Sequence, residues 1–241
     1  MMLDDSKSHG LWGRTAPPAP ETGPLLGEHL ADVVVIGAGF TGLSTALHLA
    51  EHGTKVIVLE SVAPGFGGSG RNVGLVNAGM WVPPDEVCTA IGQEYGERLL
   101  TVLGRAPDLV FDLIKKHDIA CEAVRNGTLH CTHTAAGLKG LIARADQWRQ
   151  RGAPVEILDA GETQKRLGTQ SYNASLLDHR AGTVQPLAYA RGLAQAAIGA
   201  GAQIKTDSEV LSAWREGGKW ILKSARGQVT ADWVVVATNA Y

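Results

Sequence analysis

Val33-Val34-Val35-Ile36-Gly37-Ala38-Gly39-Phe40-Thr41-Gly42 is the stretch that decides the fold of this 241-residue chain. Residues 33–36 are apolar at every position, which is typical of a strand buried on both faces. The strand stops at glycines in the spacing Gly-x-Gly-x-x-Gly, where the backbone must turn sharply into a helix. This pattern predicts a nucleotide-binding strand–helix–strand unit, with the pyrophosphate of a dinucleotide on the helix N-terminus.

The three glycines and a later carboxylate have separate roles in such a unit. Gly37 permits the tight turn, Gly39 lets the backbone approach the pyrophosphate, and Gly42 lets the helix pack closely on the strand. A second strand, Lys55-Val56-Ile57-Val58-Leu59, leads to Glu60, eighteen residues past Gly42. At that distance a carboxylate accepts a hydrogen bond from a ribose 2'-hydroxyl, and it would repel the 2'-phosphate of NADP.

Composition narrows the class of protein. The chain has 24 Asp and Glu against 22 Lys and Arg, and 44% of its residues are hydrophobic. Because no Lys/Arg cluster marks a nucleic-acid footprint, we expect no nucleic-acid partner. No apolar run approaches the ~18 to 20 residues that span a bilayer, and the start of the chain lacks a signal-peptide pattern. We therefore expect a globular, cytoplasmic protein without a transmembrane segment.

The cysteines predict neither a disulfide framework nor a metal site. Cys88, Cys121 and Cys131 are too few and too scattered for a disulfide-stapled secreted domain. In a strand, Cys131 and His133 would share one face while His130 points to the other, so only two ligands would converge. We expect ordinary strand residues and no metal.

Helical periodicity appears in the middle and in the last third of the chain. Apolar residues at 99–103 and 109–114 predict two helices. Further helices are predicted at about 135–151, where one apolar stripe is more typical of core than of function, and at 187–200. The first 30 residues contain several prolines and no sustained periodicity, which indicates an extended N-terminal arm.

Two groups of strands are predicted around these helices. Asn126-Gly127 is a strong hairpin signal and predicts that strands at about 120–124 and 128–132 pair with each other. The chain then ends in a meander, whose last strand contains the apolar run Trp233-Val234-Val235-Val236-Ala237 and is expected to be buried. Its three strands are predicted at about 207–214, 219–224 and 228–237. A meander in place of a second strand–helix–strand half favours FAD over NAD.

Three motifs resemble a known family. They are the glycine motif above, the loop Gly68-Ser69-Gly70-Arg71-Asn72-Val73-Gly74, and the ending Val236-Ala237-Thr238-Asn239-Ala240-Tyr241. In this order they resemble FAD-dependent amine and amino-acid oxidoreductases of the D-amino-acid oxidase superfamily, above all its gamma-glutamylputrescine oxidase and sarcosine oxidase-like branch. The segment Leu177-Asp178-His179-Arg180-Ala181-Gly182-Thr183-Val184-Gln185-Pro186-Leu187 is similar in style to that branch.

The resemblance implies an α/β fold in which a Rossmann-like FAD-binding domain carries an inserted α+β substrate (cap) domain. The FAD-binding domain would comprise residues 31–84 and 171–241, with part of the substrate domain at 85–170 and the arm at 1–30. The family's second half, which follows the Ala-Thr-Asn-Ala-Tyr motif, is not in this sequence. We therefore also expect that the chain is a fragment whose partner is a missing C-terminal half.

The resemblance also implies which residues hold FAD. The glycine motif and Glu60 would hold the ADP part, and residues 69–76 would follow the pyrophosphate, ribityl chain and flavin ring. Val210 would meet the adenine through its backbone, while Ala237 and Thr238 would close over the dinucleotide. The implied cofactor-binding residues are Gly37, Gly39, Phe40, Thr41, Gly42, Glu60, Ser61, Ser69, Gly70, Arg71, Asn72, Gly74, Leu75, Val76, Val210, Ala237 and Thr238. No residue is assigned as catalytic.

The expected reaction is oxidation of the C–N bond of a small amine or amino acid, with hydride transfer to flavin N5 and hydrolysis of the imine. An oxidase and a dehydrogenase both stay open. Two other hypotheses remain beside it: a truncated, non-catalytic FAD-binding fragment, and an NAD-dependent dehydrogenase.

Four further side chains have two interpretations each. Arg71 either shapes its glycine loop or clamps a substrate carboxylate, and the loop favours the first role. His179 and Arg180 either fix a turn or contact substrate. Trp81 either packs or lines the pocket.

Overall fold

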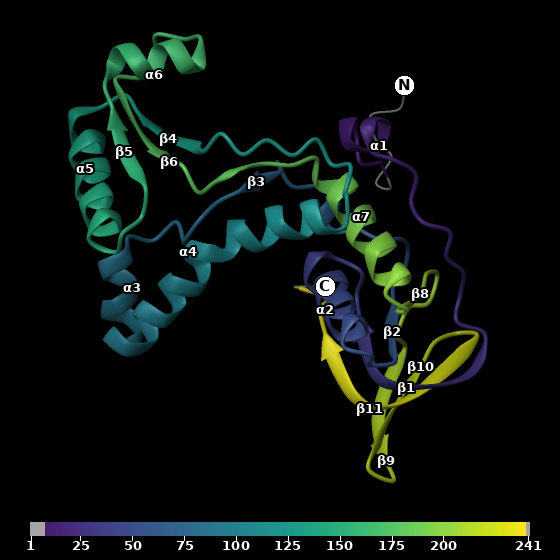
Figure 1. The fold of residues 1–241 in the computed structure, drawn as a ribbon. Coiled ribbons are helices and arrows are strands. Elements are labelled where there is room, and N and C mark those ends of the chain that lie inside the picture. Colours follow the sequence, from purple (N-terminus) through teal and green to yellow (C-terminus); the bar gives the residue numbers. More distant parts are fainter. Residues whose placement is uncertain (1–7, 240–241) are drawn as a thin grey trace. The chain divides into compact units, whose positions relative to one another are not determined.

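The computed structural model describes residues 8–239, which form two compact units (Figure 1). Residues 1–7 of the expected arm, and Ala240 and Tyr241 of the terminal motif, lie outside the described residues. Unit 1 contains residues 8–73, 117–121 and 185–239, and unit 2 contains residues 74–116 and 122–184. Unit 1 ends at Val73 and resumes, after residues 117–121, at Gln185. The sequence had placed the corresponding limits of the FAD-binding domain at residues 84 and 171. That they serve as FAD-binding and substrate domains stays a prediction.

Unit 1 is built on one six-stranded sheet with the order β8-β2-β1-β11-β10-β9. The first four strands are parallel, and β10 and β9 turn back antiparallel as the expected meander. Parallel strands that are connected through helices define the α/β class, so the predicted fold class is confirmed. The strands are β1 (Gly27–Ile36), β2 (Val56–Leu59), β8 (Gln203–Lys205), β9 (Ser212–Glu216), β10 (Lys219–Lys223) and β11 (Gly227–Val236).

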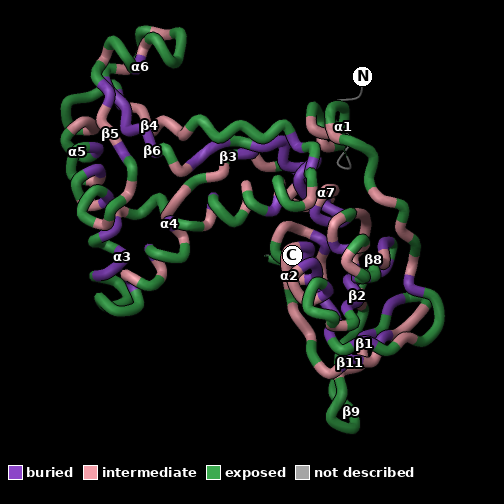
Figure 2. Tube along the Cα trace, in the orientation of Figure 1, coloured by how far each residue is buried: buried purple, intermediate pink, exposed green. Residues whose placement is uncertain are grey.

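Helices α2 (Phe40–Glu51) and α7 (Pro186–Gly199) are the main helices of unit 1, and α7 lies where a helix was predicted at 187–200. A Cβ added to Gly42 of α2 would lie 3.3 Å from Val35 Cγ1, so α2 packs on the face of β1 that carries Val35. In Figure 2 the buried colour covers β2, and on α2 and α7 it alternates with the intermediate colour. The buried side chains of α2 are Leu43, Ala46, Leu47 and Ala50.

A second buried cluster of unit 1 joins central strands of the sheet to the meander strands and to the end of the N-terminal arm. Leu222 and Val229 of the meander and Leu25 of the arm are fully buried in one cluster with Val34 and Ile57. Full burial of a side chain of this size contributes about 1.5–3 kcal/mol. The central strands are therefore buried on both faces, as their apolar sequence predicts.

The last strand differs from its prediction. β11 pairs with β1 along its whole length, but β10 pairs only with residues 228–231. Beyond that point Trp233 is 71% exposed and Val236 is 69% exposed. The expectation of a buried final strand is wrong for these side chains, because apolar sequence predicts a strand while burial requires a neighbour to cover it.

Unit 2 combines a helical layer with an antiparallel sheet of order β4-β6-β5. Its core contains Val87, Leu100, Leu141, Trp148 and Leu176, which come from three helices and the sheet. Helix α5 confirms the helix predicted at 135–151. The elements are β3 (Leu75–Val76), α3 (Pro84–Ile91), α4 (Gln93–Lys116), β4 (Thr128–Thr132), α5 (Ala135–Gln150), β5 (Val155–Leu158), α6 (Ala160–Leu167), β6 (Ala174–Asp178) and β7 (Gly182–Thr183).

The predicted hairpin around Asn126-Gly127 is wrong. β4 pairs with β6, and of the expected first strand only Val124 forms an isolated bridge, to Thr183. Gly127 does adopt a positive φ of 82°, but its N–H donates to the carbonyl of Ala181 at 3.0 Å. The Asn-Gly pair thus predicts a local turn correctly, while pairing is decided by a strand distant in sequence.

The two helices expected at 99–103 and 109–114 are one helix, α4. It runs through Pro107, which lacks an N–H and removes one hydrogen bond of the helix. Pro107 is itself buried, together with Leu100 and Leu113 of the same helix. Burial of apolar side chains on both sides of the proline keeps the helix continuous.

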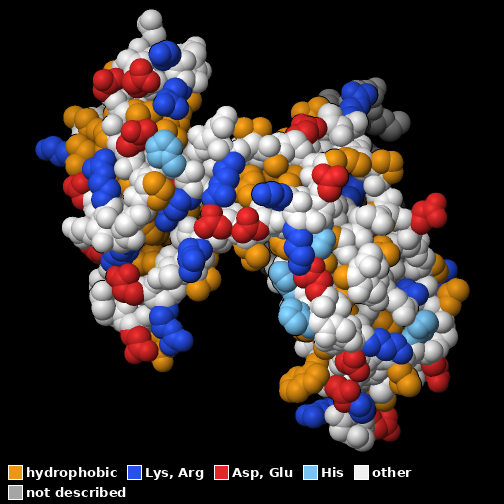
Figure 3. All heavy atoms as spheres, in the orientation of Figure 1, with side chains coloured by type: hydrophobic (Ala, Val, Ile, Leu, Met, Phe, Trp, Pro, Cys, Tyr) orange, Lys and Arg blue, Asp and Glu red, His pale blue; other side chains and the backbone are white. Residues whose placement is uncertain are grey.

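The surface carries charges of both signs. Figure 3 shows Lys and Arg side chains interspersed with Asp and Glu among the coloured residues of the face drawn. Nucleic-acid binding relies on a field of positive charge, which this face does not present among those residues. Within residues 8–239, every helix is too short or too polar to cross a membrane.

Candidate dinucleotide site

The glycine turn lies at the carboxyl ends of the parallel strands of unit 1. Gly37, directly after β1, has a φ of 100°, and a Cβ there would lie 2.7 Å from the carbonyl oxygen of Ala237. A Cβ on Gly42 would lie only 1.9 Å from the carbonyl oxygen of Gly37. The backbone therefore packs against itself here, and the end of β11 is brought against the turn that begins α2.

The N-terminus of α2 is open to an anion. Gly39 is its N-cap and has no side chain to satisfy the first N–H groups of the helix. The N–H of Phe40 donates instead to the hydroxyl of Ser69, at 2.9 Å. A Cβ on Gly39 would lie 2.9 Å from the same Ser69 oxygen, so the loop around η1 (Gly68–Gly70) sits directly against the helix N-terminus.

These segments line a cavity of about 440 Å³ that is open to solvent. It brings together three stretches that are far apart in sequence: the start of α2, the loop at Ser69 and the residues after β11. Two of its lining residues, Val236 and Asn239, are not among the predicted site residues, although both belong to the terminal motif in which Ala237 and Thr238 were singled out. The lining residues are Gly39, Phe40, Thr41, Ser69, Val236, Ala237, Thr238 and Asn239.

Glu60 follows β2 and points back to the glycine turn. Its carboxylate accepts hydrogen bonds from the N–H of Ala38 at 2.8 Å and of Val62 at 3.0 Å. The hydroxyl of Ser61 donates to it at 3.2 Å. The half-buried carboxylate is thus held at the strand ends, where a ribose next to the pyrophosphate would meet it.

The other predicted cofactor residues lie away from this cavity lining. Gly74, Leu75 and Val76 belong to unit 2, where β3 pairs with β7. Val210 packs against the core cluster of the sheet, before β9. Gly70 is buried at the end of η1, and a Cβ on it would lie 2.1 Å from the carbonyl oxygen of Gly65. Their roles toward a cofactor stay predictions.

Arg71, Arg180, His179 and Trp81 all have partners within their own unit. The Arg71 guanidinium lies over the ring of Phe66, 4.3 Å from its centroid, which agrees with shaping the loop. Arg180 bonds both carboxylate oxygens of Asp178, at 2.9 and 2.6 Å. These contacts favour the structural interpretation of both arginines.

His179 and Trp81 are likewise engaged on the surface of unit 2. The His179 ring nitrogen lies 3.1 Å from a carboxylate oxygen of Glu156. Trp81 is 77% exposed, and its ring lies 4.6 Å from that of His130. Burial, and after it the positive charge of Arg144, lowers the pKa of His130. Among residues 8–239, no three His, Cys, Asp or Glu side chains gather to hold a metal.

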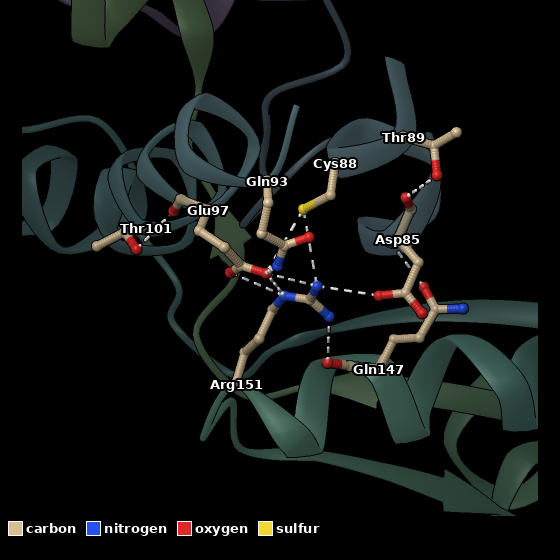
Figure 4. A network of polar contacts seen from close by, with 8 residues as sticks. All are labelled: Asp85, Cys88, Thr89, Gln93, Glu97, Thr101, Gln147 and Arg151. Carbon is tan, nitrogen blue, oxygen red and sulfur yellow. Dashed lines mark hydrogen bonds and ion pairs between the residues drawn. The ribbon is translucent and has the colours of Figure 1, made fainter. Parts of the chain in front are cut away.

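A polar network in unit 2 joins α3, α4 and the end of α5 (Figure 4). Arg151 donates to both carboxylate oxygens of Glu97, with a shortest distance of 2.7 Å, and to Asp85 at 2.9 Å. These bonds lower the pKa of Glu97 below its ordinary value of 4.5. Burial, and after it the bond to Glu97, raises the pKa of Cys88. A raised pKa disfavours the thiolate, so this cluster braces helices and is not an activated nucleophile.

Arg151→Met is expected to lower the free energy of unfolding by about 1–3 kcal/mol, because Glu97 loses its charged hydrogen bonds. Since the folded pKa of Glu97 is depressed, its contribution is present above the unfolded pKa and is lost as pH falls through the folded one. The stability difference between wild type and the variant should therefore shrink below pH 4.5. Urea titrations from pH 3 to 7 measure both effects.

Arg98→Met is the matched control for this substitution. Arg98 pairs with Glu94 at 3.6 Å, with both side chains more than 70% exposed. An exposed pair of this kind contributes about 0–1 kcal/mol. Equal losses of stability in the two variants would contradict the bracing role of Arg151.

Comparison with known proteins places these features in one family. The chain matches the DAO family model, described as FAD dependent oxidoreductase, over residues 32–241. It is 35% identical over 211 residues to gamma-glutamylputrescine oxidoreductase of Escherichia coli (strain K12), which covers 87% of this chain and 49% of that protein. It is 31% identical over 238 residues to the probable oxidoreductase OrdL of Rhizobium meliloti (strain 1021), covering 98% and 55%.

Solved structures agree on the fold. Glycine oxidase from Geobacillus kaustophilus superposes with a TM-score of 0.73 at 24% identity, over 88% of this chain and 56% of that one. L-amino acid deaminase from Proteus vulgaris gives a TM-score of 0.75 at 19% identity, over 92% and 50%. At these identities the likeness concerns the fold alone. The chain spans about half the length of the relatives it matches.

Proposed function

This chain belongs to the DAO family of FAD dependent oxidoreductases, and from that premise we propose that it is the FAD-binding part of an enzyme that oxidises the C–N bond of an amine or amino acid. The observation that carries the proposal is the cavity at the N-terminus of α2, to which the glycine motif, the Ser69 loop and the residues after β11 all contribute. The name of gamma-glutamylputrescine oxidoreductase, the Escherichia coli relative, states an amine substrate for that protein, which supports this substrate class.

The residues around the cavity fit a dinucleotide. Gly39 leaves free the space that a Cβ would fill against Ser69, and the first N–H groups of α2 offer donors to a pyrophosphate. Glu60 offers a carboxylate to a ribose hydroxyl. We assign the pyrophosphate to the start of α2 and the adenosine ribose to Glu60, and the remaining predicted residues, including Val210 and Ala237, to the rest of FAD.

The chemistry that FAD supplies when bound is acceptance of a hydride at flavin N5 from the carbon that carries the amine. The protein's own groups in this unit hold and orient the cofactor. Backbone N–H groups at the start of α2 would hold the pyrophosphate. The Ser69 hydroxyl accepts from the N–H of Phe40 and so holds its loop beside that helix start. No described side chain is assigned as a general base.

We propose that the complete enzyme includes the half by which the relatives exceed this chain. The exposed end of β11 supports this, because Trp233 and Val236 are apolar yet more than two-thirds exposed. An open strand edge with apolar side chains is the kind of surface that another strand covers. The alternative is that the chain alone is a non-catalytic FAD-binding fragment.

The test is the visible spectrum of the purified 241-residue chain, with the supernatant analysed for FAD after denaturation. We expect flavin bands, or their recovery on adding FAD. Anaerobic bleaching by gamma-glutamylputrescine, sarcosine or glycine would then identify the amine class, and reoxidation by oxygen or by a quinone would separate oxidase from dehydrogenase. A chain that takes up NAD and no FAD would contradict the proposal. A chain that binds FAD without bleaching would be the fragment.

A further inference from the structure

The part of the N-terminal arm that lies before β1, residues 9–25, is bonded at both of its ends to the rest of unit 1. At the end nearer β1, the N–H of Leu25 donates to the hydroxyl of Ser208 at 2.8 Å, and Leu25 is fully buried. Ser208 in turn donates its own N–H to the carbonyl of Glu60 at 2.9 Å. Gly23 forms a bridge with Lys205 of β8. The arm is thus anchored next to the acid of the dinucleotide unit.

The other end of the arm contacts the glycine-rich loop, residues 66–72. The indole N–H of Trp12, in the short helix α1 (Leu11–Thr15), donates to the carbonyl of Asn72 at 3.0 Å. A ring nitrogen of His9 lies 3.2 Å from the carbonyl oxygen of Phe66. The amide of Gln185, which is only 2% exposed, holds α1 in place by donating to the carbonyl of Trp12 at 3.0 Å.

Hydrogen bonds continue from this contact to the start of α2. The side-chain amide of Asn72 donates to the carbonyl of Ser69 at 2.9 Å and of Gly68 at 3.2 Å, which closes the loop. The Ser69 hydroxyl then accepts from the N–H of Phe40 at 2.9 Å. An unbroken series of partners therefore links Trp12 of the arm to the helix N-terminus that lines the cavity.

We propose that the arm is a strap that holds the loop of residues 66–72 in its dinucleotide-binding conformation, with Trp12 as a positioning residue. This rests on the proposed function in so far as the ligand is FAD. Gly67, Gly68 and Gly70 give the loop great conformational freedom, so ordering it costs binding free energy. A loop that is ordered before FAD arrives avoids that cost at the moment of binding.

Trp12→Phe removes the indole N–H and keeps an aromatic ring. We expect the dissociation constant for FAD, measured by flavin fluorescence, to rise about 3- to 10-fold, as for the loss of one hydrogen bond. Trp214→Phe is the matched control, because Trp214 of β9 donates its N–H only within its own strand, to Glu216 at 3.4 Å. The apo proteins should unfold at the same temperature as wild type.

A second measurement needs no FAD. Trypsin cleaves after Arg71, whose exposed position in the loop makes the cut report on loop opening. Cleavage at Arg71 should be faster in Trp12→Phe than in wild type and unchanged in Trp214→Phe, with His9→Ala as a second arm variant that also accelerates it. Mass spectrometry of the product ending at Arg71 gives the rate.

The outcomes separate the strap from the proposed function. Weaker FAD binding and faster cleavage confined to the arm variants would support the strap. Cleavage rates equal to wild type, or equal changes in the Trp12 and Trp214 variants, would overturn it. A wild-type chain that fails to bind FAD would count against the proposed function, and the cleavage comparison would still decide on the strap.

Discussion

Gly42→Ala is expected to abolish FAD binding and to lower the free energy of unfolding by about 3 kcal/mol or more. The reason is steric, since the new Cβ would lie 1.9 Å from the carbonyl oxygen of Gly37. This carbonyl oxygen belongs to the backbone of the glycine turn, so relief of the clash requires α2 to move away from β1. That movement would displace the helix N-terminus that lines the cavity. Urea unfolding and FAD fluorescence titration measure the two effects.

Gly199→Ala is the control for this substitution. Gly199 is also a helical glycine of unit 1, at the end of α7, but nothing lies within 4 Å of the Cβ it would gain. Alanine has the higher helix propensity, so this variant should be neutral or more stable by up to about 1 kcal/mol. If Gly42→Ala binds FAD as wild type does, the close packing of α2 on the turn is not required.

Glu60→Gln is expected to weaken FAD binding by about 10- to 100-fold, the equivalent of 1.5–3 kcal/mol for a charged hydrogen bond. The carboxylate accepts from the N–H groups of Ala38 and Val62 and offers its remaining lone pairs to a ribose hydroxyl. An amide has one oxygen in place of two and carries no charge. Isothermal titration with FAD measures the loss.

Glu209→Gln gives the same change in net charge on an exposed residue of unit 1. It should leave FAD affinity unchanged, because charges at the surface are screened by salt. Equal losses in the two variants would mean that overall charge, and not the position of Glu60, governs binding. If Glu60→Gln leaves the affinity for FAD unchanged, Glu60 does not bind the ribose.

Local physics explains which elements the sequence predicted well. β1, α2 and β2 were predictable because apolar runs, glycine spacing and helical periodicity all agree over a few residues. α5 and α7 show a continuous helical stripe, and the meander contains Gly217-Gly218 at its β9–β10 turn. In each case the signal comes from residues that are close in sequence, or from glycines that adopt a backbone conformation unfavourable for other residues.

The errors arise where partners are distant. Asn126-Gly127 predicts a hairpin, but β4 pairs with β6, which lies more than forty residues later in the sequence. The hydrogen bonds from Trp12 to Asn72 and from Phe40 to Ser69 could not be predicted from the sequence. Each has a partner in an irregular loop, where no periodic pattern of residues shows which groups will meet. Such contacts exist only once the sheet and α2 are assembled.

The sequence by itself determined the family, the α/β class and the dinucleotide unit, because the Gly37 turn and the Glu60 position are properties of one short segment. Only the tertiary structure decided which distant segments line the cavity, that the N-terminal arm is tied to the Ser69 loop, and that the end of β11 is exposed. The physical reason is that burial and long-range hydrogen bonds depend on the neighbour that assembly provides. The type and spacing of the residues in one segment do not show which distant segment will become that neighbour.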